Sequence, residues 1–367
     1  MILLLAVFFQ ETSFEEKRLG GIAEDLKPVL VEFARDGKSA AWIGKSQTTF
    51  HVCTGDSRSE GYEEVRGLAI GPDGNVSYVA RKNGRSFLVV DGKRGDDFAE
   101  IGFVYRSGDG RSHAFVARVD SASKKRVLLR DGRKRGEWED VSLLTFTPDG
   151  RTLAYAARSG DKTIVFVDDQ ARHEFEAVDR LLFSPDGKTL AVVVRRGAKF
   201  IAMMGDRSGP AFDYIGEPVF SPDGSKLAYV AKEGTRSFLV FGEERRGQTY
   251  DRIMTPVFSP DGKSIAYRAA RGGKARIVVG EREEPEFLWV GPATFSPDGR
   301  SVVYEAEFEK KRRFLLVGGR PGEEFRSLGS PVFSPDGKTV AYSADDGSGR
   351  KYMIVGSEKL GPFSSRV

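Results

Sequence analysis

The chain of 367 residues has very little cysteine and histidine. Its one cysteine, Cys53, excludes a disulfide within the chain and any zinc or iron–sulfur site built from several cysteines. The three histidines, His51, His113 and His173, supply little material for a histidine-ligated metal. The sequence therefore predicts no metal site and no cofactor.

An excess of charge of one sign and a long hydrophobic run are also missing. Lys and Arg number 57 against 53 Asp and Glu, and this balance argues against a dedicated polyanion-binding protein such as one for nucleic acid, with local basic patches left open. No segment reaches the ~18–20 apolar residues of a membrane-spanning helix. The apolar run over residues 2–9 has no basic residue before it and a poor cleavage site after it. An atypical signal and a docking strand both remain open, and so do a periplasmic or secreted and a cytoplasmic location.

What the sequence does contain is an internal repeat. The string Phe-Ser-Pro-Asp-Gly begins at Phe183, Phe220, Phe258, Phe295 and Phe333, and a near copy begins at Phe146. Three weaker copies precede them, so that nine aspartates follow one another at spacings of 36 to 40 residues. The nine are Asp36, Asp73, Asp109, Asp149, Asp186, Asp223, Asp261, Asp298 and Asp336. An aromatic residue follows each aspartate by 25 to 29 positions, from Tyr62 to Phe363.

Each repeat is predicted to form four short strands, a to d. In residues 218–253, strand a is 218–220, strand b 227–231, strand c 237–241 and strand d 249–253. Ser-Pro-Asp-Gly forms the a–b turn, because Pro fixes φ, Asp bonds its own backbone and Gly accepts a positive φ. Only residues 14–27 are compatible with a short helix.

Stacked four-stranded sheets of this size bury both apolar faces when they form a β-propeller. We therefore predict an all-β fold: one closed β-propeller of four-stranded antiparallel blades over residues 29–367, after an N-terminal lead of residues 1–28. The count favours nine blades. The alternative of eight would place the third copy outside the ring, since Arg106 and Gly108 replace its aromatic and its proline.

The unit Phe-Ser-Pro-Asp-Gly-Lys-x-Leu-Ala-Tyr resembles the WD40-like β-propeller repeat of TolB-like proteins and of prolyl-oligopeptidase-type enzymes. Its clearest copies are residues 183–191, 220–229, 258–267 and 333–342. The resemblance covers nearly the whole chain and implies the fold, but propellers have many unrelated functions. The Trp-Asp and Gly-His dipeptides of true WD40 repeats are absent.

Catalytic motifs are absent from the sequence as well. There is no Gly-x-Ser-x-Gly, and the Gly-Lys-Ser/Thr triplets lack the earlier glycine of a phosphate-binding loop. Asp345-Asp346 is expected to be a solvated turn, and His51 and Cys53 a packed blade face. We therefore expect no catalytic residues. A propeller hydrolase or lyase with a site at the central channel is kept as the alternative.

Binding residues are expected where the repeats differ. The b–c loops carry recurring cations, which suggest a basic rim for an acidic partner. The alternative is a solvated rim of mixed charge, since acids such as Glu233, Glu307 and Glu309 are interleaved with the cations. These cations include Arg81, Lys82, Arg195, Arg196, Arg271, Lys274, Arg312 and Arg313. The d–a loops are expected to line the mouth of the channel with Arg66, Asp179, Arg180, Glu217, Thr255 and Ser330. The favoured function is a monomeric, non-enzymatic scaffold that binds a protein or peptide partner.

Overall fold

The structure is a computed structural model, and it describes residues 3–10, 13–21, 25–34, 37–308 and 312–364. Contacts divide the chain into two compact units, residues 1–183 and 184–367. The part of the chain that is described contains strands and turns and no helix.

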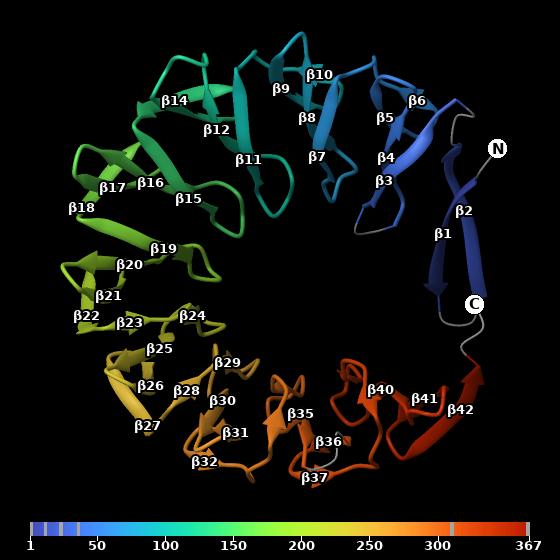
Figure 1. Ribbon diagram of the computed structural model, residues 1–367, viewed down its shortest axis with the longest axis vertical. Helices are drawn as coiled ribbons and strands as arrows, with labels where there is room; N and C mark the ends of the chain where they lie inside the picture. The colour runs from blue at the N-terminus through green and yellow to red at the C-terminus, as the bar shows by residue number, and fades with distance from the viewer. Residues whose placement is uncertain (1–2, 11–12, 22–24, 35–36, 309–311, 365–367) are drawn as a thin grey trace. The chain divides into compact units, whose positions relative to one another are not determined.

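The first four repeats each form one four-stranded antiparallel sheet in the strand order a-b-c-d (Figure 1). Blade 1 is β3 (Lys27–Phe33), β4 (Ala40–Lys45), β5 (Phe50–Thr54) and β6 (Ser57–Arg58). Blade 2 is β7 (Glu64–Ile70), β8 (Val76–Lys82), β9 (Arg85–Val90) and β10 (Lys93–Arg94). Blade 3 is β11 (Glu100–Arg106), β12 (His113–Arg118), β13 (Arg126–Arg130) and β14 (Arg133–Trp138). Blade 4 is β15 (Asp140–Phe146), β16 (Leu153–Ser159), β17 (Lys162–Val167) and β18 (Gln170–Phe175).

Blade 5 repeats this order, and in blades 6 to 9 strand a is interrupted, so that two short strands pair with strand b. Blade 5 is β19 (Ala177–Phe183), β20 (Leu190–Arg196), β21 (Lys199–Met204) and β22 (Arg207–Phe212). Blade 6 is β23 (Tyr214–Ile215), β24 (Val219–Phe220), β25 (Leu227–Glu233), β26 (Arg236–Phe241) and β27 (Glu244–Tyr250). Blade 7 is β28 (Arg252–Ile253), β29 (Val257–Phe258), β30 (Ile265–Arg271), β31 (Lys274–Val279) and β32 (Arg282–Glu283). Blade 8 is β33 (Trp289–Val290), β34 (Thr294–Phe295), β35 (Val302–Glu307), β36 (Arg313–Val317) and β37 (Arg320–Pro321). Blade 9 is β38 (Ser327–Leu328), β39 (Val332–Phe333), β40 (Val340–Asp345), β41 (Arg350–Val355) and β42 (Glu358–Ser364).

Nine such sheets, one per repeat, make the fold a β-propeller with nine blades. The third repeat forms a complete blade in spite of its weak turn motif, so the alternative of eight blades is wrong. Closure into one ring and the single-domain boundaries remain predictions.

The N-terminal lead forms a separate hairpin of β1 (Leu3–Gln10) and β2 (Ser13–Gly21). These two strands form a two-stranded sheet with each other. The short helix considered within residues 14–27 is therefore wrong, because a strand occupies Ser13–Gly21. Several charged residues follow one another there without the apolar period that a helix needs to pack.

The Ser-Pro-Asp-Gly turns are held together by bonds within six residues of chain. In blade 6, the Ser221 hydroxyl donates to Asp223 Oδ1 at 2.5 Å and accepts from the Lys226 amide at 3.0 Å. Asp223 Oδ1 also accepts from the Ser225 amide at 3.1 Å. These bonds lower the pKa of Asp223 to about 2, the Ser221 hydroxyl being the largest cause. The same arrangement recurs in the other copies of the motif that the structure describes.

Turns of consecutive blades also pack on one another, which explains why their last residue is glycine. Gly150 has a φ of 71°. A Cβ on Gly150 would lie 2.5 Å from Cβ of Ser107, in the turn of the preceding blade. The motif therefore serves both the turn itself and the packing between blades.

The core lies between the faces of neighbouring blades. Between blades 6 and 7, for example, Val230 and Leu239 pack with Tyr250, Ile253 and Tyr267. The aromatic residue at the end of strand d lies in such an interface: Phe212 is fully buried, with its ring centroid 5.3 Å from that of Phe238. The prediction that these aromatics fill the space between blades is confirmed at this position.

Strand a begins earlier than the sequence predicted. In blades 2 to 9 it starts two residues after the aromatic of strand d. It also contains a register shift, as between Arg66 and Ala69 in β7. In blades 6 to 9 the interruption of strand a takes the place of this bulge. The prediction missed the bulge because its residues follow no alternating pattern.

Candidate functional site

Three pockets occupy equivalent places between consecutive blades, at the end that carries the a–b and c–d turns. They lie between blades 2 and 3, blades 3 and 4, and blades 5 and 6, with volumes of about 330, 270 and 460 Å³. Each is lined by strand d or the c–d turn of one blade and by strand b and the turns of the next. Sequence reasoning examined the opposite end of the blades and missed these pockets.

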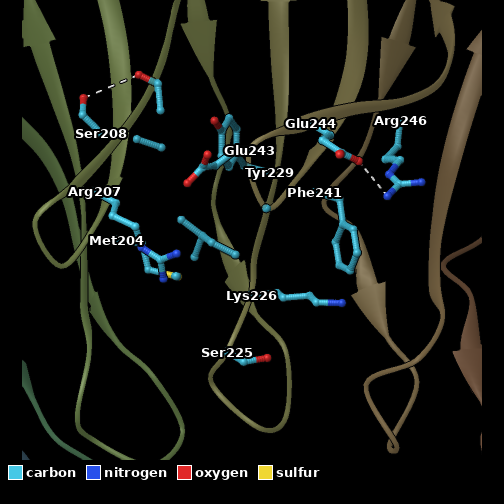
Figure 2. Close-up of a pocket in the computed structure, with 14 residues that line it drawn as sticks. Met204, Arg207, Ser208, Ser225, Lys226, Tyr229, Phe241, Glu243, Glu244 and Arg246 are labelled. Carbon is cyan, nitrogen blue, oxygen red and sulfur yellow. Dashed lines mark hydrogen bonds and ion pairs between the residues drawn. The ribbon is translucent and has the colours of Figure 1, made fainter.

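The largest of these pockets lies between blades 5 and 6, and we call it the 5–6 pocket (Figure 2). Blade 5 supplies Met204 from the end of β21, and Arg207 to Gly209 from β22. Blade 6 supplies the a–b turn with Lys226, Tyr229 of β25, and Phe241 to Glu244 around the c–d turn.

Tyr229 forms the buried wall of the 5–6 pocket. Its side chain is 2% exposed, and burial raises the pKa of its hydroxyl to about 12. The hydroxyl points toward β22, since a Cβ on Gly209 would lie 3.2 Å from it. Gly209 falls in the register shift of β22 against β21, so this bulge makes the space that the tyrosine fills.

The charged groups of the 5–6 pocket divide into paired and unpaired ones. Arg246 is paired with Glu244 at 2.7 Å, as Figure 2 shows. Lys226 Nζ lies 5.0 Å from the ring centroid of Phe241, an arrangement that favours a cation. Among the described residues, neither Lys226 nor Arg207 has an ion-pair partner, and Glu243 has none either.

A local reversal of the repeat places Lys226 in this pocket. The two residues after Asp-Gly are Lys188-Thr189 in blade 5 and Lys263-Ser264 in blade 7, but Ser225-Lys226 in blade 6. Blade 6 also has one more residue between strand c and the aromatic of strand d than blades 5 and 7. Both signals were readable in the sequence, as departures of one repeat from the others.

The residues predicted at the channel mouth lie elsewhere than the d–a loops. Arg66, Asp179 and Arg180 lie within strand a, in β7 and β19. Glu217, Thr255 and Ser330 lie in the interruptions of strand a in blades 6, 7 and 9, where all three are exposed. The predicted loop placement is wrong, because strand a already begins directly after strand d. Their binding role remains a prediction.

Three of these positions have partners within the first unit. Arg66 donates to the backbone carbonyls of Ile101, and of Gly102 at 3.3 Å, in strand a of blade 3. In the opposite direction, Arg106 of blade 3 donates to the Gly67 carbonyl at 2.6 Å. These two arginines therefore link blades 2 and 3 through their bulges. Arg180 pairs with the adjacent Asp179 at 2.9 Å.

Most cations of the predicted basic rim are paired with acids of strands b or d or of the adjoining segments. Ion pairs join Arg81 to Glu63, Lys82 to Glu60, Lys274 to Glu286, Arg312 to Glu324, and Arg313 to both Glu305 and Glu307. Arg271 bonds Gln248 and the Thr249 carbonyl. Of the eight, Arg195, Arg196 and Arg271 have no ion-pair partner in the described part of the chain. An acidic partner at this rim remains a prediction.

Acids just after the strand d aromatic also close the b–c hairpins of the next blade. Asp213 accepts from the Gly234 amide at 2.7 Å, and Asp251 accepts from the Gly272 amide at 2.8 Å. The pKa of Asp213 is lowered, first by Lys199 and then by this amide. The b–c end of the blades is therefore a surface of mixed charge.

The remaining motifs have structural partners. His51 bonds Thr49, Ser59 and Arg58, and burial raises the pKa of the Cys53 thiol to about 11. Asp346 accepts from Ser348 and Arg350 in an exposed turn. The described residues contain no group of three or more His, Cys, Asp or Glu side chains that could hold a metal ion. No described helix is long and apolar enough to span a membrane.

Solved β-propellers are the structures that this chain resembles. No model of a known protein family matches it, and no curated protein matches it either. The propeller domain of the Trilobed protease from Pyrococcus furiosus is 14% identical over 82% of this chain and 97% of that one, with a TM-score of 0.34. TolB from Acinetobacter baumannii is 17% identical over 71% of this chain and 79% of that one, with a TM-score of 0.32. A eukaryotic initiation factor is 12% identical over 88% and 96%, with a TM-score of 0.47. Likeness at this level carries no argument about function.

Proposed function

We propose that this chain is a non-enzymatic binding protein and that the 5–6 pocket takes an acidic segment of a protein partner. The free cations Lys226 and Arg207 receive the carboxylate, and Met204 and Phe241 receive an adjoining apolar side chain. A pocket of about 460 Å³ has the size of a side-chain or small-ligand site.

The observation that carries the proposal is the lysine at position 226. Blades 4, 5 and 7 have Thr152, Thr189 and Ser264 at this place, and their turns form equally well. The lysine is therefore unnecessary for the fold. It puts an unpaired cation beside an apolar surface, which is a combination that complementary charge on a partner stabilises.

A selection of random peptides on the immobilised protein tests this function. We expect enrichment of peptides with Asp or Glu beside an apolar residue. For these peptides, Lys226→Thr weakens binding about two- to fivefold, as for a partly exposed charge pair. Lys226→Thr restores the residue type of the neighbouring blades, so the fold is retained.

Lys188→Ser is the matched control, because it removes one lysine from the equivalent turn of blade 5. The Lys188 side chain is 83% exposed and does not line the 5–6 pocket. The control protein is expected to bind the peptides as the unaltered protein does. Equal loss in both variants, or a selection that enriches no acidic sequence, overturns the proposal.

A further inference from the structure

The pocket between blades 2 and 3, which we call the 2–3 pocket, contains a buried histidine with an unused nitrogen. His113 is 4% exposed and lines this pocket, and its Nε2 has no hydrogen-bond partner. His113 is the first residue of β12. Alternate residues of a strand share a face, so its ring lies on the same face as Phe115, which packs against Leu88 of blade 2.

The histidine is an exception within the repeat. The equivalent positions of blades 4, 5 and 6 hold Leu153, Leu190 and Leu227. A buried polar atom without a hydrogen-bond partner lowers the stability of the fold, and a leucine at the same position would avoid this cost. Burial lowers the pKa of His113, with Arg106 as the next cause, while Asp131 and Asp91 act in the opposite direction. The ring is therefore neutral near pH 7, and its Nε2 is a buried polar atom to which no described residue of the chain forms a hydrogen bond.

The other walls of the 2–3 pocket are mainly apolar and aromatic. Leu88, Phe98, Phe115 and Leu129 are all buried, and the rings of Phe98 and Phe115 meet edge to face at 5.9 Å and 77°. Such rings favour an aromatic guest in an edge-to-face arrangement.

The cations at the mouth of the 2–3 pocket are largely engaged. Arg94 pairs with Asp97 and Arg111 pairs with Asp73, each at 2.6 Å. A ligand recognised here consequently needs no charge of its own. The volume of about 330 Å³ accommodates a single substituted ring.

We propose that the 2–3 pocket is a binding site for a small phenolic molecule, whose ring packs among Phe98, Phe115 and Leu129 and whose hydroxyl bonds His113 Nε2. This site lies in the first unit of the chain and is independent of the 5–6 pocket. In the other blades, leucine at this position contributes only apolar packing. The histidine adds a hydrogen-bonding group that a ligand hydroxyl can use.

Titrations with phenol and with toluene test the site, because the two molecules differ by a hydroxyl in place of a methyl group. Binding is followed by backbone amide shifts of the full chain, which should move at Leu88 and Leu129. The informative quantity is the affinity for phenol relative to toluene. In His113→Leu this ratio should fall about 3- to 10-fold, the worth of one hydrogen bond.

The leucine variant is expected to fold, since leucine occupies the same position in three other blades. The unaltered protein supplies a second measurement that needs no variant. Phenol should move the Nε2 ¹⁵N signal of His113, and toluene should leave it in place. An unchanged phenol-to-toluene ratio in the variant, an Nε2 signal that ignores phenol, or no shift at the pocket residues at millimolar ligand would overturn the proposal.

Discussion

Removing the Ser221 hydroxyl tests whether the recurring turn stabilises the propeller as the geometry indicates. Ser221 is 1% exposed, and its Oγ is the acceptor for the Lys226 amide at 3.0 Å. In Ser221→Ala the Lys226 amide loses this buried acceptor. An orphaned buried amide costs about 1–3 kcal/mol. This figure covers the amide alone, because the Asp223 carboxylate is exposed and water screens its bond to the hydroxyl.

The assay is urea unfolding of the full chain, read from far-UV circular dichroism. The free energy of unfolding is expected to fall by about 1–3 kcal/mol. Hydrogen exchange of the Lys226 amide should accelerate in the same variant. Ser225→Ala is the control, since its hydroxyl is exposed in the same turn and its loss should change stability by less than about 0.5 kcal/mol. Equal stabilities of the two variants, with unchanged exchange at Lys226, would refute the account of the turn.

Three further measurements follow from the same structure. Gly150→Ala places a side chain at a positive φ and brings its Cβ within 2.5 Å of Cβ of Ser107. It should lower the free energy of unfolding by more than about 1 kcal/mol, and an unchanged urea midpoint would contradict the packing of turns. Phe212→Ala, at a fully buried ring, should cost about 3–5 kcal/mol in urea unfolding, whereas Phe363→Ala, at a ring that is 53% exposed, should cost far less; equal losses would exclude the interface role. The lowered pKa of Asp223, about 2 against 3.8, means that its contribution to stability is complete above pH 4 and is lost as the pH falls toward 2. The urea midpoint of Asp223→Asn should therefore depend less on pH between 4 and 2 than that of the unaltered protein, and equal slopes would refute this.

Sequence reasoning was most accurate where the structure depends on neighbouring residues. The turn at Ser221 to Gly224 closes through bonds that span at most five residues, so its motif is readable in each copy. The count of nine blades followed from the spacing of these turns. The start of strand a was missed because its bulge at Gly67 belongs to a bridge between blades, in which Arg106 of the next repeat supplies the bond.

The candidate sites show the same division. Lys226 was visible in the sequence as a reversed Ser-Lys pair, and His113 as one polar residue at a leucine position. The structure gives each departure a role: Lys226 lines the pocket between blades 5 and 6, and His113 lines the pocket between blades 2 and 3. The binding role of the basic rim remains a prediction, and the structure adds which of its cations are engaged: the acids that pair with Arg313 lie on strand b, six and eight residues away.

The sequence by itself determined the repeat, the turns and the number of blades. These depend on local hydrogen bonds and on the conformations that Pro, Asp and Gly allow, and both recur with the motif. The tertiary structure decided which charged and polar groups are engaged and which are free. The partner of an arginine lies on another strand of its blade, as Glu305 does for Arg313, or in another blade, as Gly67 does for Arg106. Its pairing therefore depends on tertiary packing, which the local motif does not encode.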